Sequence, residues 1–229
     1  MVLLGVNSGT RGNPLFPTSF LRTLSETINV ARGGGPLLVA IDGPGCSGKS
    51  TLAQSLEVML GDAAISIGTD EFFVPLSEQD LKCDPAAAVQ DGIAHLRWHE
   101  LRTTLDRLAQ GQGARFRPYD WEDDVLGPIR SVPSKPVVLV EGLYSMHYCL
   151  RGAYAFKLWV DGASHTRMSR VTARDGERLL NLWHSVYIPR ESSYLRSQRP
   201  FDHADAFVLG AGLEWETTGL CFCKQIYDV

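Results

Sequence analysis

The 229-residue sequence lacks the features that several classes of protein require. Its net charge is −4, whereas proteins that bind nucleic acids or anionic membranes present a basic surface. The longest apolar run, around residues 136–140, is far too short to span a bilayer. The N-terminal residues lack the basic region and apolar core of a signal peptide. We therefore expect no nucleic-acid partner and no membrane partner.

Cysteine is sparse and irregularly placed. Its five positions are 46, 83, 149, 221 and 223. Because an odd number of cysteines cannot all pair within one chain, reduced thiols in a cytoplasm are the simplest interpretation. Cys221 and Cys223 lack a second Cys or His pair at ligand spacing, so no zinc site is predicted. A hydrophobic content of 44% and a charged content of 21% are ordinary for a globular chain. We predict a cytoplasmic location.

The most informative segment that is present is the glycine-rich run over residues 43–51, GPGCSGKST. It follows the apolar residues 37–41 and precedes a helical pattern, the order of a P-loop, whose backbone N–H groups hold phosphates. The same glycines fit a dinucleotide-binding loop, with Asp70 near the position of its ribose-binding acid. Lys49 and Ser50 favour the P-loop, because it needs an ammonium for the phosphates and a hydroxyl for Mg²⁺.

These residues predict a site for ATP and Mg²⁺. The expected nucleotide-binding residues are Gly43, Gly45, Cys46, Ser47, Gly48, Lys49, Ser50, Thr51, Arg167 and Arg170. The expected metal ligands are Ser50 and Glu141. Glu141 ends a valine-rich strand predicted over residues 137–140, the position of a Walker-B acid.

A row of arginines favours a lid over the nucleotide. Arg167, Arg170, Arg174 and Arg178 share one helical face, where like charges repel unless anions meet them. ATP phosphates are suitable anions, and Arg174 is expected to neutralise charge in the transition state. The alternative is surface pairing with Asp175 and Glu177, which lie in the same segment.

Asp70 is the candidate catalytic base, and Lys49 and Arg174 complete the expected catalytic set. Asp70 follows a buried strand predicted over residues 63–67, which we expect beside the P-loop strand. A carboxylate there can accept the proton of an attacking hydroxyl. The alternative is a cap of a helix or turn. Glu71 is the weaker candidate for the base, and the neighbouring Phe72 and Phe73 are also candidates for core packing.

Alternating strands and helices predict an α/β fold of three layers with a mostly parallel sheet and ligands at the carboxyl ends of the strands. Expected strands cover 37–42, 63–67, 137–140, 156–160 and 206–209, with a short strand or hairpin at 115–121. Expected helices cover about 20–30, 49–60 and 95–110, and a helical lid covers about 165–198. Residues 1–35 are expected to form an arm and a short helix, and residues 36–229 a single domain.

Taken together, several segments resemble the uridine kinase-like branch of P-loop kinases, which also includes nicotinamide riboside kinase and, more distantly, phosphoribulokinase and pantothenate kinase. The matching pieces are residues 43–51, 70–75, 84–85, 117–120, 140–142, 167–175 and 204–209. The resemblance implies that Asp70 is the base for the acceptor hydroxyl. The predicted acceptor-binding residues are Asp70, Phe72, Asp84, Tyr119 and Asp120. Where the family hairpin continues with a Thr-His-Ser-Arg-like tail, this chain has residues 121–124, WEDD.

The sequence thus predicts an ATP- and Mg²⁺-dependent kinase that phosphorylates a hydroxyl of a nucleoside-like or ribosyl metabolite. Two alternatives remain open: a kinase for a pantothenate-type or sugar-type acceptor, and a regulatory nucleotide-binding P-loop NTPase. An Asn-Lys-x-Asp motif, which a GTPase uses to read guanine, is absent from the sequence. The acceptor is expected to be a small molecule, and the oligomeric state is left open, a homo-oligomer included.

Overall fold

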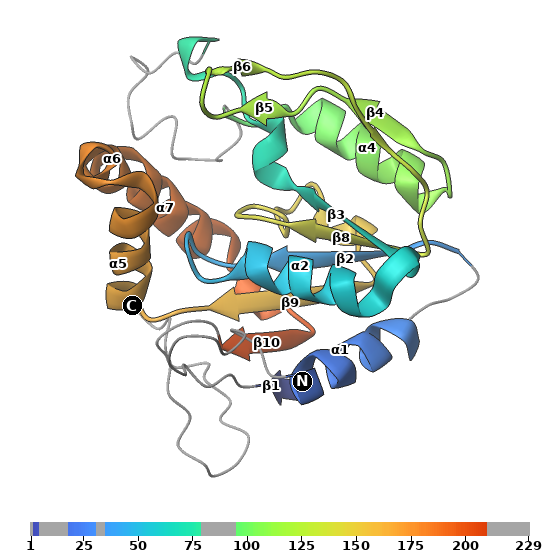
Figure 1. The fold of residues 1–229 in the computed structure, drawn as a ribbon. Helices are drawn as coiled ribbons and strands as arrows, with labels where there is room; N and C mark the ends of the chain where they lie inside the picture. Colours follow the sequence, from blue (N-terminus) through green and yellow to red (C-terminus); the bar gives the residue numbers. More distant parts are fainter. Residues whose placement is uncertain (1, 5–17, 31–34, 79–94, 210–229) are drawn as a thin grey trace.

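A six-stranded parallel sheet forms the centre of the fold in a computed structural model that describes residues 2–4, 18–30, 35–78 and 95–209 (Figure 1). Its strands, in spatial order, are β1 (Val2–Leu4), β10 (Ala206–Leu209), β9 (Phe156–Asp161), β2 (Leu37–Asp42), β8 (Val137–Glu141) and β3 (Ala64–Gly68). Every neighbouring pair is parallel, so all the strands end at one edge of the sheet. The predicted α/β class with a parallel sheet is confirmed.

Helices cover both faces of this sheet. They are α1 (Thr18–Val30) and α2 (Lys49–Leu60) on one face and α4 (Trp98–Ala109) on the other. Strand β2 is buried on both faces of the sheet. Val39 and Ile41 pack in the core beneath α1 and α2, while Leu38 and Ala40 pack in the core beneath α4. A strand buried on both faces has a continuous apolar sequence, as residues 37–41 do. The three predicted layers are therefore present.

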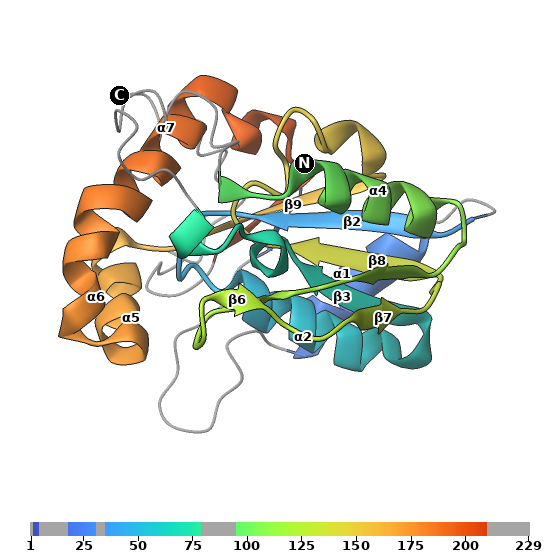
Figure 2. The same cartoon turned by 90° about the horizontal axis from the view of Figure 1, so that it is seen from above.

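A helical lid lies at the carboxyl edge of the sheet, and it is seen at the same end in both views (Figures 1 and 2). It consists of α5 (Ser164–Asp175), α6 (Glu177–Leu182), a π-helical turn (Trp183–Tyr187) and α7 (Ile188–Gln198). These bounds match the predicted lid over about 165–198. Within the parts of the chain that the structure describes, no helix is both long and apolar enough to cross a membrane.

Two short antiparallel ribbons follow α4 in the sequence. One pairs β4 (Ala114–Phe116) with β7 (Arg130–Val132), and the other pairs β5 (Tyr119–Asp120) with β6 (Val125–Leu126). Short 3₁₀ turns connect the elements at Gly61–Ala63, Thr69–Phe72, Leu76–Glu78, Arg151–Ala153 and Pro200–His203. The hairpin predicted near 115–121 is present, and α4 begins at Trp98 instead of 95 because Leu96 bridges to Phe73.

One expectation about the order of the strands was wrong. Strand β3 does not lie beside β2: β8 lies between them, with Ile41, Glu141 and Gly68 in register. A parallel crossover of this kind leaves room for a later strand, so sequence order does not fix spatial order. The α1 side chains Leu24 and Ile28 pack in the core with β2, and β1 pairs with β10.

Candidate active site

The loop between β2 and α2 has the backbone of a phosphate cradle. Gly43 and Gly48 have φ angles of 152° and 111°, which glycine adopts most readily. A Cβ added at Gly43 would lie 2.0 Å from the Val160 carbonyl oxygen, so the loop passes directly over β9. The helix α2 then begins at Lys49, and its N-terminal N–H groups face the loop. This geometry explains the glycines that the sequence places here.

A cavity of about 820 Å³ opens beside this loop at the carboxyl edge of the sheet. The loop contributes Gly45, Cys46, Gly48, Lys49, Ser50 and Thr51, and the sheet edge contributes Asp70 and Glu141. The lid contributes Arg170, Arg174, Asp175, Trp183, Tyr187, Arg190 and Glu191. Other walls include Phe73, His95, Tyr119, Trp121, Asp124 and Tyr144. Most of the residues predicted from the sequence thus meet in one cavity.

Some predicted residues do not line the cavity. Gly43 is buried against β9, and the Ser47 hydroxyl is buried without a hydrogen-bond partner. These two residues shape the loop from behind, and their contact with nucleotide, which would use backbone N–H groups, stays a prediction. Asp84 lies outside the described residues.

Lys49 and Ser50 lie at the base of the cavity. The Lys49 Nζ donates a hydrogen bond to the Pro44 carbonyl at 2.7 Å, which folds the lysine back along its own loop. Burial lowers the Lys49 pKa, while Glu141 and other carboxylates oppose this shift. The Ser50 Oγ donates to Glu141 Oε2 at 3.1 Å. The hydroxyl and the carboxylate predicted to share a metal are therefore neighbours.

Two carboxylates, Glu141 and Asp70, meet above the end of β3. A Cβ added at Gly68 would lie 2.4 Å from Asp70 Oδ1 and 3.6 Å from Glu141 Oε1. Burial, and then the charge of Asp70, raise the Glu141 pKa to about 7. The Asp70 carboxylate faces the cavity, and desolvation by the surrounding walls, followed by the charge of Glu71, raises its pKa as well. Lys49 opposes both shifts.

This donor set suits Mg²⁺. Hydroxyl and carboxylate oxygens are the hard ligands that Mg²⁺ takes, and the ion keeps several waters and substrate phosphates in its shell. Among the described residues, no group of three or more His, Cys, Asp or Glu side chains could hold a metal by itself. Ser50 and Glu141 beside a phosphate cradle fit an ion that takes its remaining ligands from water and phosphate.

Glu71 has a structural role. Its carboxylate accepts the Gly68 N–H at 2.8 Å and forms an ion pair with Arg130. Arg130 also donates to the Ser66 carbonyl at 2.8 Å, so the pair joins β7 to β3. The expectation that Glu71 is a weaker candidate for the base than Asp70 agrees with this placement.

The arginine row divides between two environments. Arg170 and Arg174 line the cavity, and Arg174 also binds Asp175 at 2.6 Å and lies over the Trp183 ring. Arg167 does not reach the cavity, because its guanidinium binds the buried Glu191 carboxylate at 2.6 Å. Its assignment as a phosphate ligand is corrected for the conformation seen here.

The lid touches the phosphate cradle through two residues that sequence reasoning missed. Glu191 Oε2 accepts the Gly45 N–H at 2.7 Å. A Cβ added at Gly45 would lie 2.8 Å from the Trp183 ring, so this ring packs directly on the loop. The indole N–H of Trp183 donates to Asp175 at 2.7 Å. The contact of Gly45 with Glu191 joins residues 146 positions apart, and no local signal in the sequence indicates it.

A third residue missed from the sequence, Asp42, anchors the lid helix α7. Asp42 ends β2 and is fully buried, and its carboxylate accepts the Gly43 N–H, the Met146 N–H and the Tyr194 hydroxyl at 2.6–2.8 Å. Burial raises the Asp42 pKa to about 6, although these hydrogen bonds oppose the shift. Tyr194 lies on α7, so the lid is tied to the strand that carries the P-loop.

The hairpin β5–β6 forms a wall of the cavity opposite the lid. The Tyr119 hydroxyl donates to Asp124 Oδ1 at 2.7 Å, and Asp124 also accepts the Leu76 and Ser77 N–H groups. Asp120 instead accepts two N–H groups of its own turn, at 2.9 and 3.3 Å, and does not line the cavity. We correct the assignment of Asp120 as an acceptor ligand. Asp124, which the sequence did not single out, is the acid of this wall.

Phe72 and Phe73 have opposite environments. Phe72 is fully buried and packs on Phe116, with ring centroids 4.4 Å apart, so its assignment to acceptor binding was wrong. Phe73 lines the cavity, and its ring centroid lies 4.9 Å from Trp121 and 6.2 Å from Tyr119. The 3₁₀ turn over Thr69–Phe72 sets this division.

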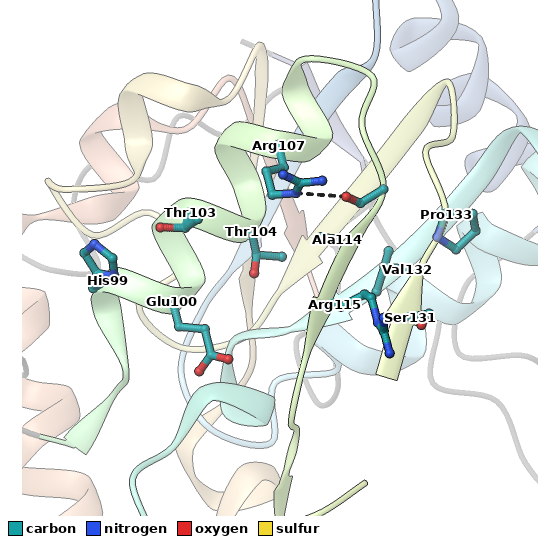
Figure 3. A pocket seen from close by; sticks show the side chains of 11 residues that line it. His99, Glu100, Thr103, Thr104, Arg107, Ala114, Arg115, Ser131, Val132 and Pro133 are labelled. Atoms are coloured by element: carbon teal, nitrogen blue, oxygen red, sulfur yellow. Dashed lines mark hydrogen bonds between the residues drawn. The ribbon is translucent and has the colours of Figure 1, made fainter. Parts of the chain in front are cut away.

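A second hollow of about 700 Å³ lies between α4 and the ribbon of β4 and β7 (Figure 3). Arg107 donates to the Gly113 carbonyl at 3.0 Å across it. His99 lies at the left of the view and Arg115 right of its centre, and their side chains do not converge on one point. The hollow contains none of the P-loop residues or cavity carboxylates, so it is separate from the candidate site.

Comparisons with known proteins agree with this geometry. The chain is 30% identical over 143 residues to a uridine kinase of Chloroflexus aurantiacus, covering 61% of this chain and 68% of that protein. It is 29% identical over 109 residues to a uridine kinase of Halobacterium salinarum, covering 47% and 48%. A uridine kinase-like protein 4 of Arabidopsis thaliana is 24% identical over 176 residues, covering 75% and 36%. The chain thus spans about half of the second relative and about a third of the third.

Solved structures share the fold. A "possible uridine kinase" from Bacillus stearothermophilus has a TM-score of 0.65 at 19% identity, covering 82% of this chain and 96% of that one. A phosphoribulokinase from Rhodobacter spheroides has a TM-score of 0.54 at 16% identity, covering 77% and 71%. The model of the phosphoribulokinase and uridine kinase family matches residues 38–179, which is more than half of the chain. The chain therefore belongs to the phosphoribulokinase/uridine kinase family of P-loop kinases.

Proposed function

We propose that this chain is an ATP- and Mg²⁺-dependent kinase that phosphorylates a hydroxyl of a ribosyl or nucleoside-like metabolite. The observation that carries the proposal is the meeting of a phosphate cradle, the Ser50–Glu141 pair and the Asp70 carboxylate in one cavity. A loop that only bound nucleotide would not need a second carboxylate facing the same space. Membership of a P-loop kinase family supports the use of ATP.

Asp70 is the proposed catalytic base. As the acceptor oxygen forms its bond to the γ-phosphorus, the bond to the ADP oxygen breaks and the hydroxyl proton passes to the Asp70 carboxylate. Burial, and then the charge of Glu71, raise the Asp70 pKa, and an upward shift makes a carboxylate a stronger base. Placement at the edge of the cavity leaves the carboxylate open to an acceptor.

Lys49, Arg170 and Arg174 are proposed to stabilise the charge on the transferred phosphoryl group. All three line the cavity, and preorganised cations stabilise a transition state more than water does. Ser50 and Glu141 would hold Mg²⁺, which would offset the negative charge of the phosphates.

Phe73, Tyr119, Trp121 and Asp124 form one wall of the cavity, which we call the acceptor wall. This wall favours an acceptor that carries a ring. Phe73, Tyr119 and Trp121 present aromatic faces to the cavity, and such faces stack on planar rings. Relatives named uridine kinase point to the same class of acceptor. A pantothenate-type or sugar-type acceptor lacks a planar ring that could stack on these faces, so we rank it second.

Replacement of Asp70 by Asn tests the proposal. We expect Asp70→Asn to lower kcat by about 10²- to 10⁴-fold, because the variant cannot accept the proton, while the affinity for Mg-ATP stays within about twofold. Asp62→Asn, which changes an exposed aspartate after α2, is the matched control and should keep full activity. The assay is a screen of ATP consumption over nucleosides, other ribosides, pantothenate and sugar phosphates.

The screen separates the competing functions. Near-normal turnover of Asp70→Asn would remove Asp70 as the base. Transfer to pantothenate or sugar phosphates alone would support the second class of acceptor. No transfer to any of these compounds, with ATP hydrolysis that only a protein stimulates, would support a regulatory NTPase instead.

A further inference from the structure

Two side chains of the lid helix α7 contact the strand and the loop of the phosphate cradle. Glu191 and Tyr194 are three positions apart, so they lie on one face of the helix, and both are buried. Glu191 accepts the Gly45 N–H within the loop, whereas the Tyr194 hydroxyl donates to Asp42 Oδ2 at 2.6 Å, just before the loop. The helix is therefore docked at two points, one within the cradle and one at its base.

The two contacts differ in their access to a ligand. Glu191 and Gly45 line the cavity, so a nucleotide phosphate can reach the N–H group that the Glu191 carboxylate holds. Asp42 and Tyr194 are only 0% and 3% exposed, and neither lines the cavity. A bound phosphate would thus displace the first contact and leave the second in place.

The contact between Tyr194 and Asp42 is suited to hold the helix alone. Its length of 2.6 Å is that of a hydroxyl donating to an ionised carboxylate, which is one of the stronger hydrogen bonds in proteins. Burial, and then the charge of Asp42, raise the Tyr194 pKa well above its usual value, so the hydroxyl keeps the proton that it donates. The Asp42 carboxylate also accepts the Gly43 and Met146 N–H groups at 2.7 and 2.8 Å, so α7 is tied to a fixed point of the sheet.

The position of α7 determines that of two arginines on α5. Arg167 of α5 binds Glu191 Oε1, whereas the Gly45 contact uses Oε2, so this ion pair can persist when phosphate takes the Gly45 N–H. Arg170 and Arg174 follow Arg167 on the same helix and line the cavity. A shift of α7 would therefore shift both arginines. Positive groups stabilise a transition state best when they are held in place beforehand.

We propose that Asp42 is a positioning residue for phosphoryl transfer: through Tyr194 it keeps α7 docked when a nucleotide displaces Glu191, so that the lid arginines stay in place over the phosphates. This inference rests on the proposed kinase function and deepens it, because it names the residue that sets the geometry of the lid. Asp42 does not line the cavity, so it acts through the helix and not on the substrates.

The ionisation of Asp42 controls this contact. Burial raises the Asp42 pKa to about 6, although its hydrogen bonds and the charge of Lys49 oppose the shift. The titratable groups that face Asp42 are Lys49 of α2, Tyr144 and Tyr154 of the segment between β8 and β9, and Tyr194 of α7, on which His147 stacks. Protonation turns one carboxylate oxygen into a donor and weakens the hydrogen bonds that the carboxylate accepts. The docking of α7 should therefore weaken as the pH falls through 6.

Tyr194→Phe tests the proposal, because it removes the hydroxyl and keeps the ring that packs on Tyr144. With Mg-ATP and uridine, or another active compound of the screen, we expect kcat at pH 8 to fall about tenfold and KM for the acceptor to stay within about twofold. The ratio of wild-type to variant kcat should shrink to about threefold at pH 5.5, because Asp42 is then largely protonated in the wild type. The titrations of Asp70 and Glu141 occur in both proteins and cancel in this ratio.

Tyr154→Phe is the matched control. It makes the same change at a buried tyrosine outside the cavity, whose hydroxyl has no hydrogen-bond partner in the part of the chain that the structure describes. It should keep the wild-type kcat at both pH values. Asp42→Asn removes the charge that Tyr194 meets, so it should lower kcat by itself, and the addition of Tyr194→Phe should then cause little further loss.

Hydrogen exchange provides a second readout, which needs no acceptor. With Mg²⁺ and a non-hydrolysable ATP analogue bound, the amides of residues 188–198 should exchange about tenfold faster in Tyr194→Phe than in the wild type or in Tyr154→Phe. Without the analogue the difference should be smaller, because Glu191 still holds Gly45. Wild-type exchange and wild-type kcat in Tyr194→Phe would overturn the proposal. A loss of kcat of the same size at both pH values would also overturn it, because the hydroxyl would then act independently of Asp42.

Failure of the proposed function has a different signature. A wild type that transfers phosphate to no compound of the screen would remove the kinase function, and the positioning role of Asp42 with it. An active wild type whose kcat is unchanged by Tyr194→Phe would remove only the role of Asp42 and leave the kinase function intact.

Discussion

The carboxylate of Glu191 accepts a hydrogen bond from a backbone N–H of the phosphate cradle: its Oε2 lies 2.7 Å from the nitrogen of Gly45. Glu191 belongs to the lid helix α7, is 4% exposed, and binds Arg167 through its other oxygen at 2.6 Å. The N–H groups of a P-loop bind nucleotide phosphates. A carboxylate on one of them is a competing anion supplied by the chain itself, and it also holds an arginine that the sequence had assigned to phosphate binding.

Removing the charge of Glu191 should therefore strengthen nucleotide binding. We predict that Glu191→Gln raises the affinity for a non-hydrolysable Mg-ATP analogue about fivefold, because hydrogen bonds to a charged acceptor are roughly twice as strong as neutral ones. The freed Arg167 becomes available to the phosphates. Calorimetric titration measures the affinity directly. The quenching of Trp183, whose ring packs on Gly45, provides a second readout.

Glu177→Gln is the control for this prediction, since Glu177 is an exposed glutamate at the start of α6. It should leave the affinity unchanged. Thermal unfolding of Glu191→Gln checks that the unpaired Arg167 has not disturbed the fold. A folded variant with weaker nucleotide binding would show that Glu191 supports the bound loop and does not compete with phosphate.

Replacement of Phe72 should mainly lower the stability of the fold, whereas replacement of its neighbour Phe73 should mainly weaken acceptor binding. Phe72→Ala should reduce the free energy of unfolding by about 3–5 kcal/mol, because it empties a fully buried position against Phe116. Phe73→Ala should cost less stability and raise KM for the acceptor, because Phe73 lines the cavity. Urea unfolding and steady-state kinetics measure the two effects. A larger rise in acceptor KM for folded Phe72→Ala than for Phe73→Ala would reverse this assignment.

Asp124 should hold the acceptor wall in the position that binds the acceptor. Its carboxylate binds the Tyr119 hydroxyl and the Leu76 and Ser77 N–H groups. We predict that Asp124→Asn raises KM for the acceptor about tenfold with KM for ATP unchanged, because an uncharged oxygen holds the wall less firmly. Asn tolerates the φ of 53° at this position, so the backbone is not strained.

Two further variants serve as comparisons for the Asp124 prediction. Tyr119→Phe removes one of the three hydrogen bonds to Asp124 and should give a smaller rise in acceptor KM. Asp123→Asn changes the exposed neighbour and should give none. Equal KM values for Asp123→Asn and Asp124→Asn would exclude a positioning role for Asp124.

The parts of the site that the sequence predicted are those set by local pattern. The P-loop and its lysine need only a strand, a turn and a helix in succession, and Glu141 follows a strand whose burial the valines reveal. The nearness of Ser50 and Glu141 follows from the parallel pairing of β2 with β8, which brings their carboxyl ends together.

The parts that were missed depend on contacts between distant segments. Glu191 meets Gly45 across 146 positions and Tyr194 meets Asp42 across 152, and nothing in either local sequence encodes the meeting. Which of Phe72 and Phe73 faces the cavity depends on a 3₁₀ turn, whose short length gives no usable periodicity. Asp120 and Asp124 are acids of one tight turn, and the contact that distinguishes Asp124 is with Leu76, 48 positions away.

The burial of His95 should appear as a pH dependence of stability. Its pKa is about 3 in the folded chain and near 6.5 when the chain unfolds. Between these values the unfolded state binds a proton that the folded state does not, so this contribution to stability is complete above pH 6.5 and is lost as the pH falls toward 3. At pH 5 the loss amounts to about 2 kcal/mol of the free energy of unfolding.

His95→Phe removes this contribution, so its free energy of unfolding should fall by about 2 kcal/mol less than that of the wild type between pH 7.5 and pH 5. Urea unfolding at the two pH values measures the difference, and titrations of all other groups cancel in the comparison. His99→Phe removes an exposed histidine and should keep the wild-type loss. The same loss in His95→Phe and the wild type would mean that water or chain movement accommodates a charged His95.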